Sequence, residues 1–155
     1  MEKDVSWIPR ETYEEIVRWM PICTVDIILF DRSKKKVLLF KRMNKPLRGT
    51  YFAPGGRILK DEDLKAAVRR QTKKELGIEL DEKKLVFGGV INELYEDSEF
   101  DSNYHSVDIY WGYVLDGNEV FRMDDQHSHY DWFDINDGNF HPYIKEKISG
   151  LISKI

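Results

Sequence analysis

The sequence is short of cysteine and of long apolar runs and has no excess of positive charge, and each of these absences excludes a class of protein. Cys23 is the single cysteine in 155 residues, which excludes an intramolecular disulfide and a multi-cysteine metal site, and fits a reducing cytoplasm. No apolar run approaches the roughly 18 residues that span a bilayer, and residues 1–7 lack the apolar core of a signal peptide. The formal net charge of -4 gives no broad basic footprint for nucleic acid. We therefore expect a soluble, cytoplasmic protein without a membrane or nucleic-acid partner.

The composition is that of a globular protein. Hydrophobic residues make up 41% of the chain and charged residues 34%, which indicates an apolar core under a charge-rich surface. A chain of 155 residues can bury a sizeable core without disulfides, and no repeat or low-complexity segment interrupts it. We predict a single domain over residues 1–155.

Apolar periodicity predicts strands before and after a central helix. The predicted helices cover residues 10–20, the stretch between Asp61 or Asp63 and Gly77, and residues 142–155. The predicted strands cover residues 22–30, 37–40, 85–95, 107–115 and 130–133. The first two strands form a hairpin whose basic turn, residues 34–36, we assign to solvated surface, with phosphate attraction as the alternative. This order favours a mixed sheet between helices.

Two predicted strands carry polar residues that bear on their burial. Alternation places Asp26 on the apolar face of its strand, where an unpaired carboxylate costs several kcal/mol, so a bulge or a face open to solvent is the plain interpretation. In the strand over 107–115, alternation places Asp108, Tyr110 and Gly112 on a wetter face. The pattern alone leaves the environment of Asp26 open.

The segment from Gly55 to Ile78 organises the rest of the chain. It opens with a glycine turn, and Asp61 or Asp63 can cap a helix that ends at Gly77. The apolar stripe of this helix runs into a carboxylate, since its members are Leu64, Ala67, Val68, Gln71, Thr72 and Glu75. Glu75 is either solvated at a rotated helix end or meets a cation beside the turn.

The spacing of this segment resembles the Nudix hydrolase signature, G-x5-E-x7-R-E-U-x-E-E-x-G-U, where U is aliphatic. The matching residues are Gly56, Glu62, Arg70, Glu75, Gly77 and Ile78. Three positions depart from it, because Gln71 and Lys74 replace acidic residues and Thr72 replaces an aliphatic one. With Asp125-Gln126-His127 downstream, the altered signature resembles the GDP-mannose mannosyl hydrolase branch, which cleaves a sugar carbon–oxygen bond instead of a phosphoanhydride.

The resemblance implies a fold, a cofactor and a set of site residues. The fold is the Nudix α/β/α sandwich with a mixed β-sheet, and the cofactor is one Mg²⁺ ion, with Mn²⁺ as an alternative. His127 would be the general base and Asp26 would lie near the sugar, while Arg42 and Arg57 would contact phosphate. The implied catalytic residues are His127, Asp26, Arg42, Arg57 and Arg70, and the implied metal ligands are Gly56, Glu75 and Gln126.

Four residues receive other assignments. Glu93 departs from the branch, which carries a histidine near the substrate at that position. Arg48 has no support from the resemblance and is assigned to the surface, His129 is assigned no role, and His141, before Pro142, is assigned a structural one. The residues alone leave open that both His127 and His129 lie in a solvated acidic loop.

The activity implied is Mg²⁺-dependent hydrolysis of a nucleotide sugar, GDP-mannose first, to GDP and mannose. A Nudix pyrophosphatase that attacks phosphorus is the alternative, although that chemistry commonly recruits several cations through the acidic cluster reduced here. A non-catalytic nucleotide-sugar binding module is the third reading. Members of the family are commonly homodimers, and the helix over residues 10–20 is the expected dimer element.

Overall fold

The structure is a computed structural model that describes residues 4–123 and 127–155. Within those ranges, three α-helices, one short 3₁₀ helix and seven strands follow one another along the chain. The helices are α1 (Arg10–Trp19), α2 (Leu64–Leu76) and α3 (Pro142–Leu151), with η1 (Glu82–Lys84) as the 3₁₀ helix, and the strands are β1 (Ile22–Phe30), β2 (Lys36–Arg42), β3 (Tyr51–Phe52), β4 (Gly55–Arg57), β5 (Val86–Tyr95), β6 (Tyr104–Val114) and β7 (His127–Asp134). In the same ranges, no helix has the length and apolar character to cross a membrane.

The strands form one mixed sheet in the order β3-β2-β1-β6-β5. β1 pairs with β6 in parallel along its whole length, and it pairs antiparallel with β2 and β4. β7 pairs antiparallel with β2, and β5 with β6. β1 is the central strand of this order and is almost entirely buried, as its largely apolar sequence indicates.

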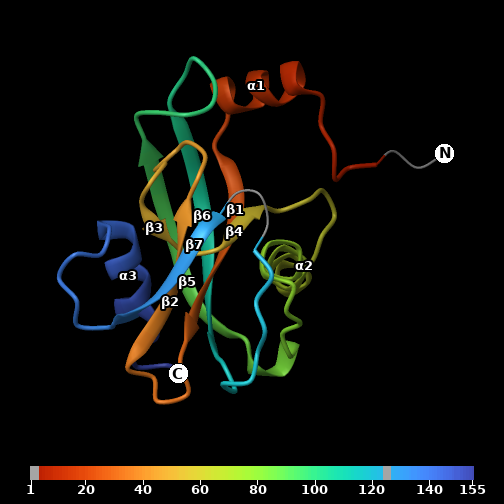
Figure 1. The fold of residues 1–155 in the computed structure, drawn as a ribbon. Helices are drawn as coiled ribbons and strands as arrows, with labels where there is room; N and C mark the ends of the chain where they lie inside the picture. The colour runs from red at the N-terminus through yellow and green to blue at the C-terminus, as the bar shows by residue number, and fades with distance from the viewer. Residues whose placement is uncertain (1–3, 124–126) are drawn as a thin grey trace.

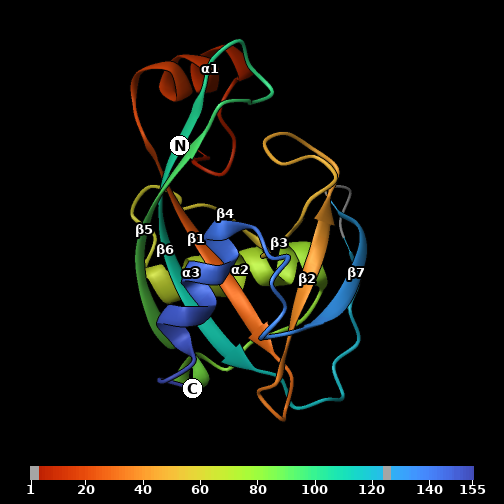
Figure 2. The ribbon, with the colours of Figure 1, turned by 90° about the vertical axis from the view of Figure 1, so that its left-hand side faces the viewer.

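Helices cover both faces of the sheet, which confirms the predicted α/β/α sandwich (Figure 1). In Figure 2, α3 lies in front of the sheet and α2 behind it, while α1 lies beyond one end. The apolar side chains accordingly divide into two clusters, one between the sheet and α2 and the other between the sheet and α3. Each cluster removes apolar surface from water, which is the main stabilising contribution to such a fold.

The predicted boundaries of α2 are confirmed. The Asp63 side chain accepts hydrogen bonds from the backbone N–H groups of Lys65 and Ala66, at 3.0 and 3.2 Å, so Asp63 and not Asp61 is the cap. At the other end Gly77 adopts a left-handed conformation with φ 70°, where a glycine carries no steric penalty. The capped helix therefore projects one defined face onto β1 and β4.

The expectation of a wetter face on the strand over 107–115 is wrong. Asp108 is fully buried and Tyr110 is nearly so. β6 lies between β1 and β5, and α3 packs against the face that carries these residues. Alternation identified which residues share that face, but the helix that covers it follows about thirty positions later in the chain.

Candidate active site

The Gly55–Gly56 turn and the end of α2 meet at one carboxylate. β4 pairs with β1 so that Gly55 lies opposite Asp26, and α2 packs over the pair. Glu75 is 1% exposed, and its Oε2 accepts a hydrogen bond from the Gly55 N–H at 3.0 Å. The interpretation of Glu75 as a solvated helix end is therefore wrong, and the carboxylate lies at the turn.

Gln71 occupies the space between Glu75 and the turn. Its Nε2 donates to Glu75 Oε1 at 2.7 Å and to the Gly55 carbonyl oxygen at 3.1 Å. A Cβ atom on Gly56 would lie 2.7 Å from this amide, so only glycine fits there without a shift. Lys74 is exposed. Of the four residues at the acidic positions of the signature, Glu62 and Glu75 keep a carboxylate, and Glu62 is bound by Arg70. Glu75 is therefore the signature carboxylate at the turn, with a neutral amide beside it.

Arg70 holds the loop that follows the turn. Its guanidinium donates to Glu62 from Nε at 2.6 Å and from Nη2 at 2.9 Å, and Nη2 also donates to the Arg57 carbonyl oxygen at 2.9 Å. Hydrogen bonding from Arg70 lowers the pKa of Glu62, and the Leu59 N–H, which donates to the same carboxylate at 3.1 Å, adds to this. These contacts describe a positioning residue, and a direct part for Arg70 in catalysis stays a prediction.

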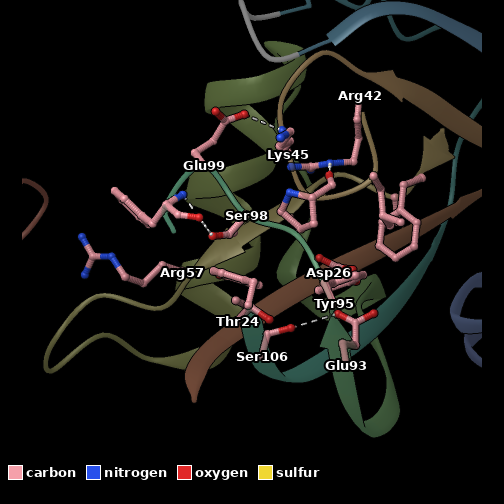
Figure 3. A pocket seen from close by; sticks show the side chains of 18 of the residues that line it. Thr24, Asp26, Arg42, Lys45, Arg57, Glu93, Tyr95, Ser98, Glu99 and Ser106 are labelled. Atoms are coloured by element: carbon pink, nitrogen blue, oxygen red, sulfur yellow. Dashed lines mark hydrogen bonds between the residues drawn. The ribbon is translucent and has the colours of Figure 1, made fainter. Parts of the chain in front are cut away.

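A cavity of about 280 Å³ brings together four of the predicted residues, Asp26, Arg42, Gly56 and Arg57. Figure 3 shows Arg42 and Arg57 on opposite sides of the cavity and Asp26 close to Glu93. Both arginines are partly exposed, whereas Asp26 and Glu93 are buried. The Arg57 guanidinium points outward, where it donates to the backbone oxygens of Val5 and Ser6 at 3.4 Å. Arg42 donates from Nε to the Pro46 carbonyl oxygen at 2.8 Å, which fixes the guanidinium at the rim. We call the part of the cavity beside Arg42 and Arg57 its rim, which is basic, and the part beside Asp26 and Glu93 its floor, which is acidic.

The acidic floor is neutralised in part by a buried lysine. Lys147 of α3 is fully buried, and its ammonium pairs with Asp26 and lies 3.0 Å from both Glu93 Oε2 and Asp108 Oδ2. Thr24 donates to Asp108 at 2.7 Å. Burial alone would lower the pKa of Lys147, but the three carboxylates outweigh it and raise that pKa above its usual value.

The carboxyl groups of the floor are shifted as well. Burial, together with the charge of Asp26, raises the pKa values of Glu93 and Asp108. In the described ranges, the group of metal-ligating side chains with suitable spacing is Asp26, Glu93 and Asp108, whose ligand atoms lie within 4.8 Å of one another. Because the Lys147 ammonium already lies among these carboxylates, we take it as the cation of this group, separate from the turn beside Glu75.

His127 and His129 lie on β7, which is longer than predicted. The backbone of His127 opens this strand opposite Arg42, a residue of the cavity rim; its side chain and the whole of Gln126 lie outside the described residues. His129 is exposed, and its ring packs on that of Tyr51 at 6.2 Å. His141 has the structural role assigned to it, because its Nδ1 caps α3 by accepting from the Tyr143 N–H.

Arg48 was assigned correctly from the sequence, whereas Lys147 was not assigned to the site. Arg48 is 58% exposed and pairs with Glu99 at 3.4 Å, which confirms its surface assignment. Lys147 was missed. It lies three residues after Ile144 and one before Ile148, on the apolar face of α3, and a lysine on an apolar helical face was the available signal.

Comparisons with known proteins agree with this geometry. Residues 20–151 match the sequence model of the NUDIX domain, and the chain belongs to the Nudix hydrolase family. It is 31% identical over 153 residues to the low-salt glycan biosynthesis protein Agl8 of Haloferax volcanii, a match that covers 97% of this chain and 94% of that protein.

Two further matches bear on activity and fold. The chain is 32% identical over 116 residues to the ADP-ribose pyrophosphatase of Methanocaldococcus jannaschii, covering 75% of this chain and 63% of that one. The crystal structure of a MutT NUDIX hydrolase from Burkholderia pseudomallei superposes with a TM-score of 0.70 at 20% identity, over 85% of this chain and 98% of that one. The structural match supports the fold alone.

Proposed function

We propose that this protein hydrolyses a nucleotide sugar by attack of water at the anomeric carbon, with GDP-mannose as the first substrate to test. The products would be a nucleoside diphosphate and the free sugar. The observation that carries the proposal is the Gln71 amide, which donates 2.7 Å to Glu75 where the signature has a second carboxylate. The similarity to a glycan biosynthesis protein supports a sugar-containing substrate.

The turn beside Glu75 suits one cation that shares its coordination with the substrate. Glu75 supplies one carboxylate and the turn supplies a backbone carbonyl at Gly56, with Gln126 as the third expected ligand. These are the oxygen donors that Mg²⁺ prefers, and so sparse a set leaves positions for diphosphate oxygens and water; Mn²⁺ would fit the same donors. When bound, the ion would supply positive charge for the departing diphosphate.

The chain's own residues then divide the remaining work. Arg42 and Arg57, at the rim of the cavity, would hold diphosphate oxygens and offset the charge of the leaving group. His127 would take the proton from water as the glycosidic bond breaks. Asp26, at the floor, would favour the positive charge that develops at the anomeric carbon, a contribution tempered by its pairing with Lys147.

A phosphoanhydride hydrolase is the second candidate, and a specific observation favours it. The similarity to an ADP-ribose pyrophosphatase extends over 75% of the chain. Both candidates use the same cavity and the same cation site, so the bond that is cleaved distinguishes them. A non-catalytic binding module would show tight binding without turnover.

Hydrolysis in ¹⁸O-labelled water tests the proposal directly. We expect the label in the sugar, with nucleoside diphosphate as the other product. Label found only in a phosphate product, together with nucleoside monophosphate and sugar phosphate, would select the pyrophosphatase.

Paired histidine variants test the general base. His127→Gln should lose about 10²–10⁴-fold in turnover with little change in substrate affinity, since that is the usual effect of losing general-base assistance. His129→Gln, two positions away on the same strand, is the matched control and should be nearly silent. If His129→Gln lowered turnover while His127→Gln did not, His129 and not His127 would be the general base.

Two features of the whole molecule stay predictions. A homodimer through α1 is supported by the exposure of Trp19 and Met20, at 74% and 60%, at the end of that helix. The cytoplasmic location rests on the lone Cys23. Sedimentation of the purified protein would determine the first.

A further inference from the structure

The charge inside the cavity changes sign between its rim and its floor. The outer part is lined by Arg42, Lys45 and Arg57 against the single carboxylate of Glu99, and the inner part by Asp26 and Glu93 (Figure 3). A molecule that places a diphosphate at the rim must therefore direct its other end toward carboxylates. The floor therefore selects the chemical group at the end of the substrate opposite the diphosphate. That orientation of the substrate rests on the proposed function.

The floor is negative as well as buried. Asp26, Glu93 and Asp108 surround a single ammonium, that of Lys147, so the group keeps negative charge even when one carboxyl group retains a proton. Burial keeps water and salt away, and charges in such a place are screened weakly. A second negative charge placed in the inner cavity would meet strong repulsion.

The floor is also fixed in position. Its members come from β1, β5, β6 and α3, and the Lys147 ammonium joins all of them. The ammonium lies 4.9 Å from the centre of the Phe52 ring, which closes its remaining side. Glu93 therefore has a defined place, which a residue that discriminates between ligands needs.

Glu93 lines the inner cavity with one side of its carboxylate. Glu93 is 3% exposed and lines the cavity, and its Oε1 accepts from Ser106 Oγ at 3.3 Å. Its Oε2 is enclosed beside the Lys147 ammonium, 3.0 Å away, so a ligand in the cavity meets the carboxylate on the side of Oε1. A carboxylate oxygen offers two lone pairs, so Oε1 can accept a hydroxyl of the substrate beside the Ser106 hydrogen bond.

We propose that Glu93, held in place by Lys147, is the specificity-determining residue of the cavity, accepting a hydroxyl of a neutral sugar and excluding sugars that carry a carboxylate. The substrate class is thus a nucleoside diphosphate linked to an uncharged hexose. A nucleotide linked to a uronic acid, which carries a carboxylate at C6, is rejected.

Internal competition between two matched substrates tests this without any variant. Equal amounts of GDP-mannose and GDP-mannuronate, which differ only at C6, are incubated with the protein and Mg²⁺, and the depletion of each is followed by chromatography. A second pair, UDP-glucose and UDP-glucuronate, covers a change of base. We expect the neutral member of whichever pair reacts to be consumed at least about tenfold faster, because a unit charge about 7 Å away, at an effective dielectric constant near 20, changes binding by that much or more.

Two matched variants locate the selectivity. Glu93→Gln removes one charge from the floor and should reduce the preference for the neutral sugar by about tenfold. Glu99→Gln is the control, because Glu99 also lines the cavity but is held near the rim by the Lys45 N–H at 2.7 Å, and it should keep the wild-type ratio. Equal consumption of both members, a preference for the uronate, or a ratio that moves with Glu99→Gln and not with Glu93→Gln would overturn the inference.

Failure of this inference and failure of the proposed function remain distinguishable. Depletion ratios do not depend on which bond breaks, whereas the ¹⁸O experiment reports only the bond. If neither member of a pair is consumed, titration calorimetry with the same pairs measures the preference free of turnover, and equal affinities or the absence of binding would overturn the inference.

Discussion

Replacing Lys147 by methionine isolates the contribution of the buried ion group to stability. The ammonium is fully buried between Asp26, Glu93 and Asp108, and methionine has nearly the same length without the charge. Removing one member of a buried ion pair typically destabilises by about 3–5 kcal/mol, because the remaining charge is left uncompensated. With three carboxylates left behind, we expect Lys147→Met at pH 8 to lie at the upper end of that range.

The loss should depend on pH in a defined direction. The folded-state pKa values of Glu93 and Asp108 are raised, so their contribution to stability is complete below their unfolded pKa values, about 4, and is lost as pH rises through the folded values. Lys147 lowers both values in the wild type. Without it both carboxyl groups protonate more readily, and the deficit of the variant should shrink between pH 8 and pH 5. The lysine itself, whose pKa is raised, stays charged throughout this window.

Urea unfolding followed by circular dichroism measures both effects. With a slope of about 2 kcal/mol per molar urea, the midpoint of Lys147→Met should fall by roughly 2 M at pH 8. Lys145→Met makes the same substitution at an exposed position of α3 and should stay within about 0.5 kcal/mol of wild type. Adding Asp108→Asn to Lys147→Met should restore part of the loss, because one stranded carboxylate is removed. A Lys147→Met variant as stable as wild type at pH 8, or one whose deficit grows toward pH 5, would refute this account of the floor.

Three further predictions concern the turn and α2. Glu75→Gln should lose most Mg²⁺-dependent turnover while staying folded, whereas Lys74→Gln, exposed beside it, should not; undiminished activity at low Mg²⁺ would remove Glu75 from the cation site. Arg70→Met should lower the free energy of unfolding by about 1–3 kcal/mol, because it removes the hydrogen bonds to Glu62. Since the pKa of Glu62 is lowered in the folded protein, this loss is complete above the unfolded pKa of Glu62 and fades as pH falls through the folded pKa. Arg69→Met, at a side chain that is 45% exposed, is the control, and equal losses in the two variants would contradict the positioning role of Arg70. Gly55→Ala should destabilise by about 1–3 kcal/mol, as its Cβ would lie 1.8 Å from the facing carboxylate oxygen of β1, and an unchanged thermal midpoint would disagree with that packing.

The local structure of this protein follows from its sequence. Capping at Asp63, the left-handed glycine at Gly77 and the apolar spacing between them determine α2 and the inward direction of Glu75. β1 was located by its β-rich composition between Pro21 and the polar stretch that begins at Asp31. These features depend on neighbours within a few positions, which a sequence displays directly.

The floor of the cavity, by contrast, was decided by the tertiary structure. Asp26 and Lys147 are 121 positions apart, and the plain interpretation of Asp26 as open to solvent was wrong for that reason. Periodicity shows which residues share one face of an element, but it does not show which element covers that face or what charge it brings. Asp108 was assigned to a wetter face on the same limited information. Only the packing of α3 over β1, β5 and β6 turns four separately unremarkable polar residues into one buried ion group.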